Sequence, residues 1–282
     1  MAYANDVVPE LLTKVEKEFN KRHKDSKALK ALNAKLKDGT ATYHDANLYA
    51  IEVGEMLKDA YKKITGDDLP DGRMYYNIAE RVIGTTIEEK FNLVTEMAEK
   101  VQKALNKDAD IGLAAIKPEI DPNRVQGILN RLAEAENFDN IAWILGEPVV
   151  EFMLNAVDES IRINADFQAK SGLRPIIVRK MESTPITTYI KKVKGKVYGP
   201  YPQTQPMPCE FCSSLAGTYD YEEVRDSHND VFRRHAHCRC TVEYYPGDGK
   251  VQNAHTKTWQ DINKREIQDR ISRITSRINP MT

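Results

Sequence analysis

The chain of 282 residues is long enough for one large domain or two smaller ones, and its 41% hydrophobic and 29% charged residues exclude wholesale disorder. It has no uncharged apolar run of about 18 residues, so we expect no membrane span, and no secretory signal peptide is visible at its start. The net charge of −1 hides two basic ends, because residues 13–37 carry nine Lys and Arg against three acids and residues 250–282 carry seven against three.

Amphipathic helices are predicted from the start of the chain. Apolar residues recur there at spacings of three and four, which places them on one stripe of a helix. The stripe consists of Val8, Leu11, Leu12, Val15 and Phe19. Leu29, Leu32 and Leu36 continue the pattern as far as the break at residues 38–40. Thr42, with Asp45 three residues later, then predicts the N-cap of a helix that ends near Tyr61.

Three further helices are predicted before residue 172. Thr86 and Glu89 have the spacing of a capping box, which predicts a helix start at Thr86. Asp121 followed by Pro122 predicts another start, with Asp as N-cap and Pro in the first turn. The tract from about 140 to 169 is rich in apolar residues, and we expect it to form the centre of the helical core. Its apolar positions include Trp143, Val150, Met153, Val157 and Ile161.

The character of the sequence changes at residues 171–175. β-branched residues follow at 176–178, and residues 193–198 resemble a hairpin with Gly195 at its turn. Beyond Gly249 a helical pattern resumes and continues to the end of the chain. The predicted fold class is therefore mainly α: a helical domain over residues 1–172, a small α+β zinc-binding module over 173–249, and a basic amphipathic tail helix over 250–282.

All the cysteines of the chain lie in the α+β module. Cys209-x-x-Cys212 is followed, after 22 residues, by the run His235-Ala-His-Cys238-Arg-Cys240. A Cys-x-x-Cys pair and a second cluster that returns from a distance can complete a tetrahedral zinc site. Disulfides are rare in proteins made in a reducing cytoplasm. We therefore predict a structural Zn²⁺ ion, with ligands drawn from Cys209, Cys212, His235, Cys238 and Cys240.

Several alternatives remain open from the sequence. If residues 238–245 form a strand, Cys238 and Cys240 point to one face and a site of four thiolates is possible. Otherwise His235 replaces Cys240 and gives a site of three cysteines and one histidine. His228 and His237 are weaker candidates. A redox pair at Cys209 and Cys212, inert cysteines, or a disulfide formed later would also account for the cluster.

The same residues resemble the minor head protein family of tailed bacteriophages, the head morphogenesis proteins typified by the F protein of phage Mu. The likeness extends from near Arg179 to Tyr245, and its most specific part is the closing His-x-x-Cys-Arg-Cys run. The stretch from 184 to 208 departs from the family pattern. The residues that carry the likeness are Cys209, Cys212, Leu215, Gly217, Tyr219 and the run from Phe232 to Cys240.

The resemblance implies a non-enzymatic virion protein, assembled in the host cytoplasm and placed inside the capsid. Its expected partners are the portal protein and a capsid or scaffolding protein, and its expected role is head morphogenesis, with DNA packaging or ejection as further possibilities. The basic ends could contact genomic DNA without sequence specificity, or simply solvate the surface.

A zinc-dependent nuclease or hydrolase is the alternative function. It would use His235, His237 or His228 together with Asp226 or Asp230. A catalytic zinc ion keeps an open position for water, whereas a site dominated by thiolates is closed. The number of cysteines therefore favours a structural site over a catalytic one.

Overall fold

The computed structural model describes residues 6–181, 191–193, 196–198, 210–225, 231–235, 237–246, 250–252 and 259–261. Its first part is helical, as predicted. The helices in chain order are α1 (Val8–His23), α2 (Lys27–Lys37), α3 (Tyr43–Tyr61), η1 (Gly66–Asp68), η2 (Pro70–Gly72), α4 (Tyr76–Ala79), η3 (Glu80–Gly84), α5 (Thr85–Asp108), α6 (Pro122–Glu134), α7 (Phe138–Ile141), η4 (Ala142–Leu145) and α8 (Glu147–Lys170).

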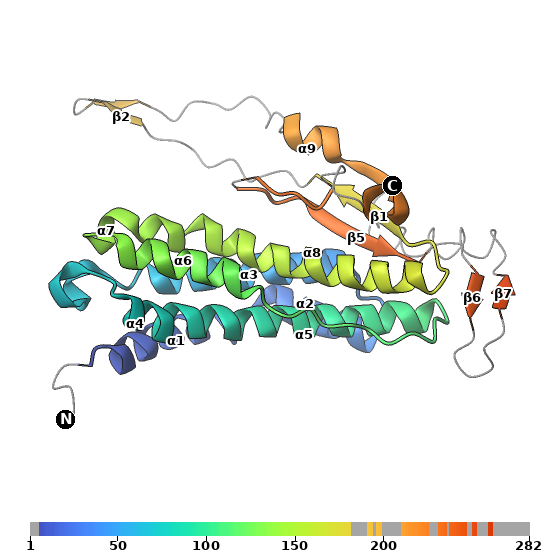
Figure 1. Cartoon of the computed structure of the whole chain (residues 1–282), viewed down its shortest axis with the longest axis horizontal. Helices are drawn as coiled ribbons and strands as arrows, with labels where there is room; N and C mark the ends of the chain where they lie inside the picture. Colours follow the sequence, from blue (N-terminus) through green and yellow to red (C-terminus); the bar gives the residue numbers. More distant parts are fainter. Residues whose placement is uncertain are drawn as a thin grey trace.

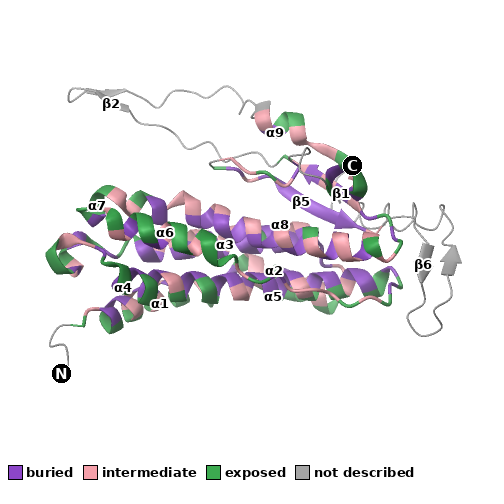
Figure 2. Ribbon diagram, in the orientation of Figure 1, coloured by how far each residue is buried: buried purple, intermediate pink, exposed green. Residues whose placement is uncertain are grey.

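The long helices α3, α5 and α8 form the middle of an elongated bundle, and α1 packs against α3 (Figure 1). Their buried residues face one another across the bundle (Figure 2). Helices α3 and α8 approach closely at Gly54, where a Cβ atom would lie 2.7 Å from the Cα atom of Val150. Glycine at this position therefore allows the two helix backbones to pack together.

A three-stranded antiparallel sheet follows the bundle. Its central strand β1 (Ile176–Lys180) lies between β4 (Gly217–Asp220) and β5 (Thr241–Tyr245), with Ile177 opposite Tyr219 and Tyr244. The short helices α9 (Glu210–Leu215) and α10 (Tyr221–Arg225) flank β4 in the sequence. Two separate antiparallel pairs join β2 (Lys191–Val193) to β3 (Lys196–Tyr198) and β6 (Lys250–Gln252) to β7 (Trp259–Asp261). The first pair confirms the antiparallel pairing of the predicted hairpin, whose turn at Gly195 lies outside the described residues.

The sheet and the bundle share one hydrophobic core. Ile177, Val242 and Tyr244 belong to the same buried cluster as the apolar residues of α3 and α8. The ring of Tyr244 meets that of Tyr43 on α3 edge to face, with centroids 6.3 Å apart. The amide of Asn47, one turn further along α3, donates to the Val242 carbonyl at 3.0 Å. The strands are thus attached to α3 through both apolar and polar contacts.

Two of the three predicted helix starts are confirmed. Thr42 and Asp45 form the capping box of α3, and the Asp121 carboxylate accepts a hydrogen bond from the Asn123 amide at the start of α6. The helix predicted from Thr86 is present as α5, but its predicted capping box is not formed, because the helical course begins at Tyr76 and passes through the π-helical η3 into α5. Thr86 is buried, and its hydroxyl lies 2.7 Å from the Val82 carbonyl one turn earlier.

Three other predictions need correction. The tail helix predicted from residue 250 is not formed at 250–252 or 259–261, where β6 and β7 pair instead; residues 262–282 lie outside the described residues. Trp143 is 62% exposed and lies in η4, before α8 begins with Pro148 in its first turn. The last strand of the sheet begins at Thr241, after both cysteines. Within the described residues, no helix is both long and apolar enough to cross a membrane.

Candidate metal centre

Helix α9 and the segment before β5 bring three cysteines together. The thiols of Cys212, Cys238 and Cys240 lie within 4.8 Å of one another, and the three residues are 4%, 1% and 3% exposed. The sulfur atoms of Cys212 and Cys238 are 4.0 Å apart. Cys209, the first residue of the predicted Cys-x-x-Cys pair, lies outside the described residues.

The spacing of these sulfur atoms fits one tetrahedral metal ion. Two thiolates bound to one zinc ion at ~2.3 Å are separated by about 3.8 Å. The observed 4.0 Å is close to that separation and far beyond the length of a disulfide bond. Three of the five predicted ligand residues therefore converge in a way that could hold a metal ion.

His235 lies beside this cluster but is not one of the residues whose ligand atoms all lie within 4.8 Å of one another. Its Nε2 atom lies 2.9 Å from the Cys212 sulfur, and its ring packs edge to face against Phe211. The sequence left open a site in which His235 replaces Cys240. Because Cys240 is one of the three convergent thiols, a histidine ligand would instead join the three cysteines. The remaining position of a tetrahedron is left to His235 or Cys209.

The other predicted histidine and aspartate candidates are not part of the cluster in the described residues. The His237 side chain is 72% exposed, and its Nδ1 atom lies 3.7 Å from Glu147. Its backbone is in the left-handed region, with a φ of 63°, and this turn directs the chain into Cys238. His228, Asp226 and Asp230 lie outside the described residues.

Two buried arginines that sequence reasoning missed contact the Cys238 sulfur. Arg234 is bound to Asp158 of α8 by a 2.7 Å contact, donates to the Cys240 carbonyl at 2.7 Å, and lies 3.8 Å from the Cys238 sulfur. Arg179 of β1 reaches the same sulfur at 3.7 Å. Arg179 lies 59 positions before Cys238, so only the fold brings it to the sulfur, whereas Arg234 is four residues before Cys238 and within the closing run, although nothing in the run itself identifies this contact.

The protonation of the cluster follows from these contacts. A hydrogen bond from Cys240, with the charges of Arg234 and Arg179, lowers the pKa of the Cys238 thiol to about 4 despite its burial. Burial raises the pKa of Cys212. The hydrogen bond to Cys238 raises the pKa of the Cys240 thiol, and burial adds to that effect. Of the three thiols, Cys238 is thus the one that most readily becomes a thiolate, and its sulfur accepts a hydrogen bond from the Cys240 thiol.

Arg239, between the last two cysteines, joins the cluster to the helical bundle. Its guanidinium donates to Glu55 of α3 at 2.8 Å and also pairs with Glu147 at the start of α8. Lys58 pairs with the same two carboxylates. The Cys-Arg-Cys segment is therefore held against two helices by an ion-pair network, which gives the arginine of that run a structural role.

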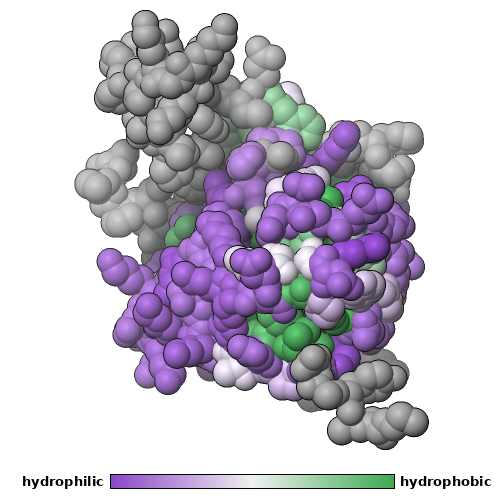
Figure 3. All heavy atoms as spheres, turned by 90° about the vertical axis from the view of Figure 1, so that its left-hand side faces the viewer, coloured by the Kyte–Doolittle hydropathy of each residue, from purple (hydrophilic) through white to green (hydrophobic). Residues whose placement is uncertain are grey.

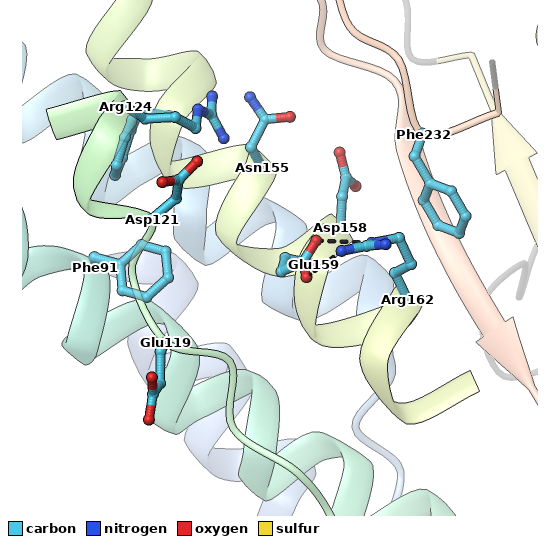
Figure 4. A pocket seen from close by; sticks show the side chains of 10 residues that line it. Phe91, Glu119, Asp121, Arg124, Asn155, Asp158, Glu159, Arg162 and Phe232 are labelled. Carbon is cyan, nitrogen blue, oxygen red and sulfur yellow. Dashed lines mark hydrogen bonds and ion pairs between the residues drawn. The ribbon is translucent and has the colours of Figure 1, made fainter. Parts of the chain in front are cut away.

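A cavity of about 360 Å³ lies beside α8 (Figure 4). Among its charged side chains, Glu159 pairs with Arg162, and Arg124 lies over the ring of Phe152. Asp158 lines the cavity and pairs with Arg234. Asp158 thus connects the cavity lining to Arg234, which contacts the Cys238 sulfur.

The end of the bundle formed by α4 and α7 exposes aromatic side chains. Tyr75 and Tyr76 are each 38% exposed, and Trp143, directly after α7, is 62% exposed. A view of this end also shows a hydrophobic area bordered by hydrophilic residues, which is made up of residues other than these tyrosines and Trp143 (Figure 3). A protein partner could contact an area of this kind.

The basic N-terminal stretch is partly neutralised within the fold. Four of its nine cations form ion pairs with carboxylates: Lys14 with Asp68, Arg22 with Asp59, Lys30 with Asp25, and Lys35 with Asp45. Lys17, Lys21, Lys24 and Lys27 are exposed. The charge available to a phosphate backbone is thus smaller than the composition suggests.

Comparison with known proteins identified no family model, curated protein or solved structure that matches this chain.

Proposed function

We propose that the chain is a minor head protein of a tailed bacteriophage, whose cysteine cluster holds a structural zinc ion. The observation that carries the proposal is the convergence of three buried thiols at the closing run of the family motif. A structural zinc site is closed and rich in thiolates, whereas a catalytic one reserves a position for water. Three convergent thiols, with His235 or Cys209 as the fourth ligand, favour the closed arrangement.

The donor atoms also favour zinc among the common metals. Thiolate and imidazole ligands suit zinc, while magnesium and calcium require oxygen ligands. The role of the ion would be to hold α9 to the segment before β5, since Cys212 belongs to the former and Cys238 and Cys240 to the latter. Because Arg239 binds α3 and α8, the same ion would stabilise the docking of the sheet on the bundle.

In a virion protein, the aromatic end of the bundle and the exposed lysines of α1 would contact other virion components. The exposed aromatic end of the bundle, around Trp143, is the surface we assign to the portal or to a capsid or scaffolding protein. Aromatic residues are enriched in protein interfaces. The exposed lysines of α1 would contribute weak contacts with packaged DNA.

Purified virions provide the test of this function. Particles produced from the genome that encodes this chain should contain it at low copy number relative to the major capsid protein, by quantitative mass spectrometry. Comparison of intact particles with particles that have released their DNA then shows whether the chain leaves with the genome. Absence of the chain from both virions and procapsids would contradict the proposal.

A further inference from the structure

Two guanidinium groups from different elements converge on one sulfur atom. The Cys238 sulfur lies 3.7 Å from Nη2 of Arg179 and 3.8 Å from Nη1 of Arg234. Arg179 is 1% exposed, and the side chain of Arg234 is 2% exposed. Hydrogen bonds from charged donors to anionic acceptors are stronger than those between neutral groups.

The two arginines differ in how their charge is balanced. Arg234 forms a buried ion pair with Asp158. Arg179 donates instead to the carbonyls of Val231 and Arg233, at 2.8 Å for the latter, and no carboxylate pairs with it among the described residues. A buried cation that meets only carbonyl groups is costly, and an anionic partner offsets that cost. The Cys238 sulfur, 3.7 Å from Nη2 of Arg179, can carry that negative charge, while the Asp158 carboxylate, paired with Arg234, acts on Arg179 without a direct contact.

We propose that Arg179 is the buried counter-cation of the metal-bound Cys238 thiolate and, with Arg234, positions that thiolate for the ion. The inference rests on the proposed metal site. A divalent ion bound by three or four thiolates carries net negative charge, and Arg179 compensates part of it without touching the ion. Residues that hydrogen-bond to metal ligands orient them, and their loss lowers metal affinity.

Arg179→Gln tests the proposal, since it removes the charge while keeping a hydrogen-bonding side chain. Zinc affinity, measured by competition with a chelator of known affinity, should fall by about 10- to 100-fold. Arg179→Lys keeps the charge but loses the planar fork, so it should recover part of the affinity. Arg162→Gln is the matched control: it removes an arginine of α8 that pairs with exposed Glu159, and it should leave zinc affinity unchanged.

A second measurement separates positioning from general stabilisation. The free energy of unfolding, with and without zinc, should show a smaller gain from zinc in Arg179→Gln than in the wild type. A purely structural role would lower both values equally. If Arg179→Gln does not fold, Arg179→Lys decides: its charge should preserve part of the zinc affinity, and a loss of about 10- to 100-fold in that variant would overturn the counter-cation.

The outcomes distinguish this inference from the one it rests on. A wild-type protein that takes up no zinc would remove the proposed metal site itself. A wild-type protein that binds zinc, together with an equally tight Arg179→Gln variant, would leave the metal site intact and overturn the role of Arg179. Equal weakening in Arg179→Gln and Arg179→Lys would contradict the counter-cation and leave the hydrogen bonds as the cause.

Discussion

Among single residues, the cysteines differ in what holds them in place. Cys238 is contacted by two arginines, and Cys240 offers its carbonyl to one of them. Cys212 is contacted by His235 and by the other thiols. Arg179 reaches both sulfur atoms, but Arg234 contacts that of Cys238, so we expect Cys212 to depend on the ion more than Cys238 does. This difference makes Cys212 the informative position for substitution.

Protein purified without chelators should contain about one zinc ion per chain, and Cys212→Ser should lose most of it. Serine keeps the size of the side chain but supplies no thiolate. Ser213→Ala is the control, since it alters the exposed neighbour on the same helix and should retain the metal. Elemental analysis measures both. Metal-free wild-type protein, or full occupancy in Cys212→Ser, would count against the site.

The cysteine cluster was predictable at this scale because its signal is local. Cys238 and Cys240 are two residues apart, and their spacing from Cys212 is read directly from the chain. The partners of the cluster were not predictable, because Arg179 and Asp158 lie 59 and 80 positions before Cys238 in the numbering and meet it only through the docking of the sheet. The fourth ligand stays a prediction, since Cys209 lies outside the described residues.

Among the secondary-structure elements, the sequence predicted helices well where side-chain spacing and capping agreed. The start of α3 at Thr42 follows from a cap that its own residues form. Thr86 misled because its hydroxyl bonds back to Val82 within a continuous helix, which produces the same residue types as a cap. The prediction that Trp143 belongs to the buried helical tract was wrong. Apolar composition does not indicate which residue is left exposed by the turn before α8.

The close contact between α3 and α8 gives a prediction for glycine. Gly54→Ala would place a Cβ atom 2.7 Å from Val150 Cα, so the two helices must move apart. We expect a loss of about 1–3 kcal/mol in the free energy of unfolding.

Gly127→Ala is the matched control at an exposed position of α6, where a new Cβ meets no atom within 4 Å. It should stabilise the protein by about 0.4–1 kcal/mol. Urea unfolding measures both, and equal effects would contradict the close packing.

Over the whole molecule, the sheet and the segment before β5 are coupled to the bundle by apolar packing and by two ion pairs. Apolar residues of β1 and β5 share the core of the helices, Arg234 pairs with Asp158, and Arg239 pairs with Glu55. The predicted boundary near residue 172 marks the change from helix to strand, but the hydrophobic core is continuous across it. Loss of metal should therefore affect α8 as well as the strands, because Arg234 and Arg239 transmit the change.

The distribution of charge over the whole molecule leads to a prediction about DNA. Lys17 and Lys21 on α1 and Lys24 directly after it are exposed, while four other cations of the basic stretch are paired, so we expect weak binding to DNA of any sequence. Counterion release should make this binding fall steeply between about 50 and 200 mM salt. Reversal of the three charges by Lys17→Glu, Lys21→Glu and Lys24→Glu should weaken retention in gel-shift titrations.

The control for this experiment is the same number of reversals elsewhere on the bundle. Lys100→Glu, Lys103→Glu and Lys107→Glu alter exposed positions of α5 and change the net charge equally. If α1 contacts phosphates, the α1 variant loses binding and the α5 variant retains most of it. Equal loss in both variants would mean that only net charge matters. No retention at low salt in the wild type would mean that the basic stretch binds a protein partner or solvates the surface. Lys14 and Lys35 already pair with Asp68 and Asp45, which favours a role within the fold for those two residues.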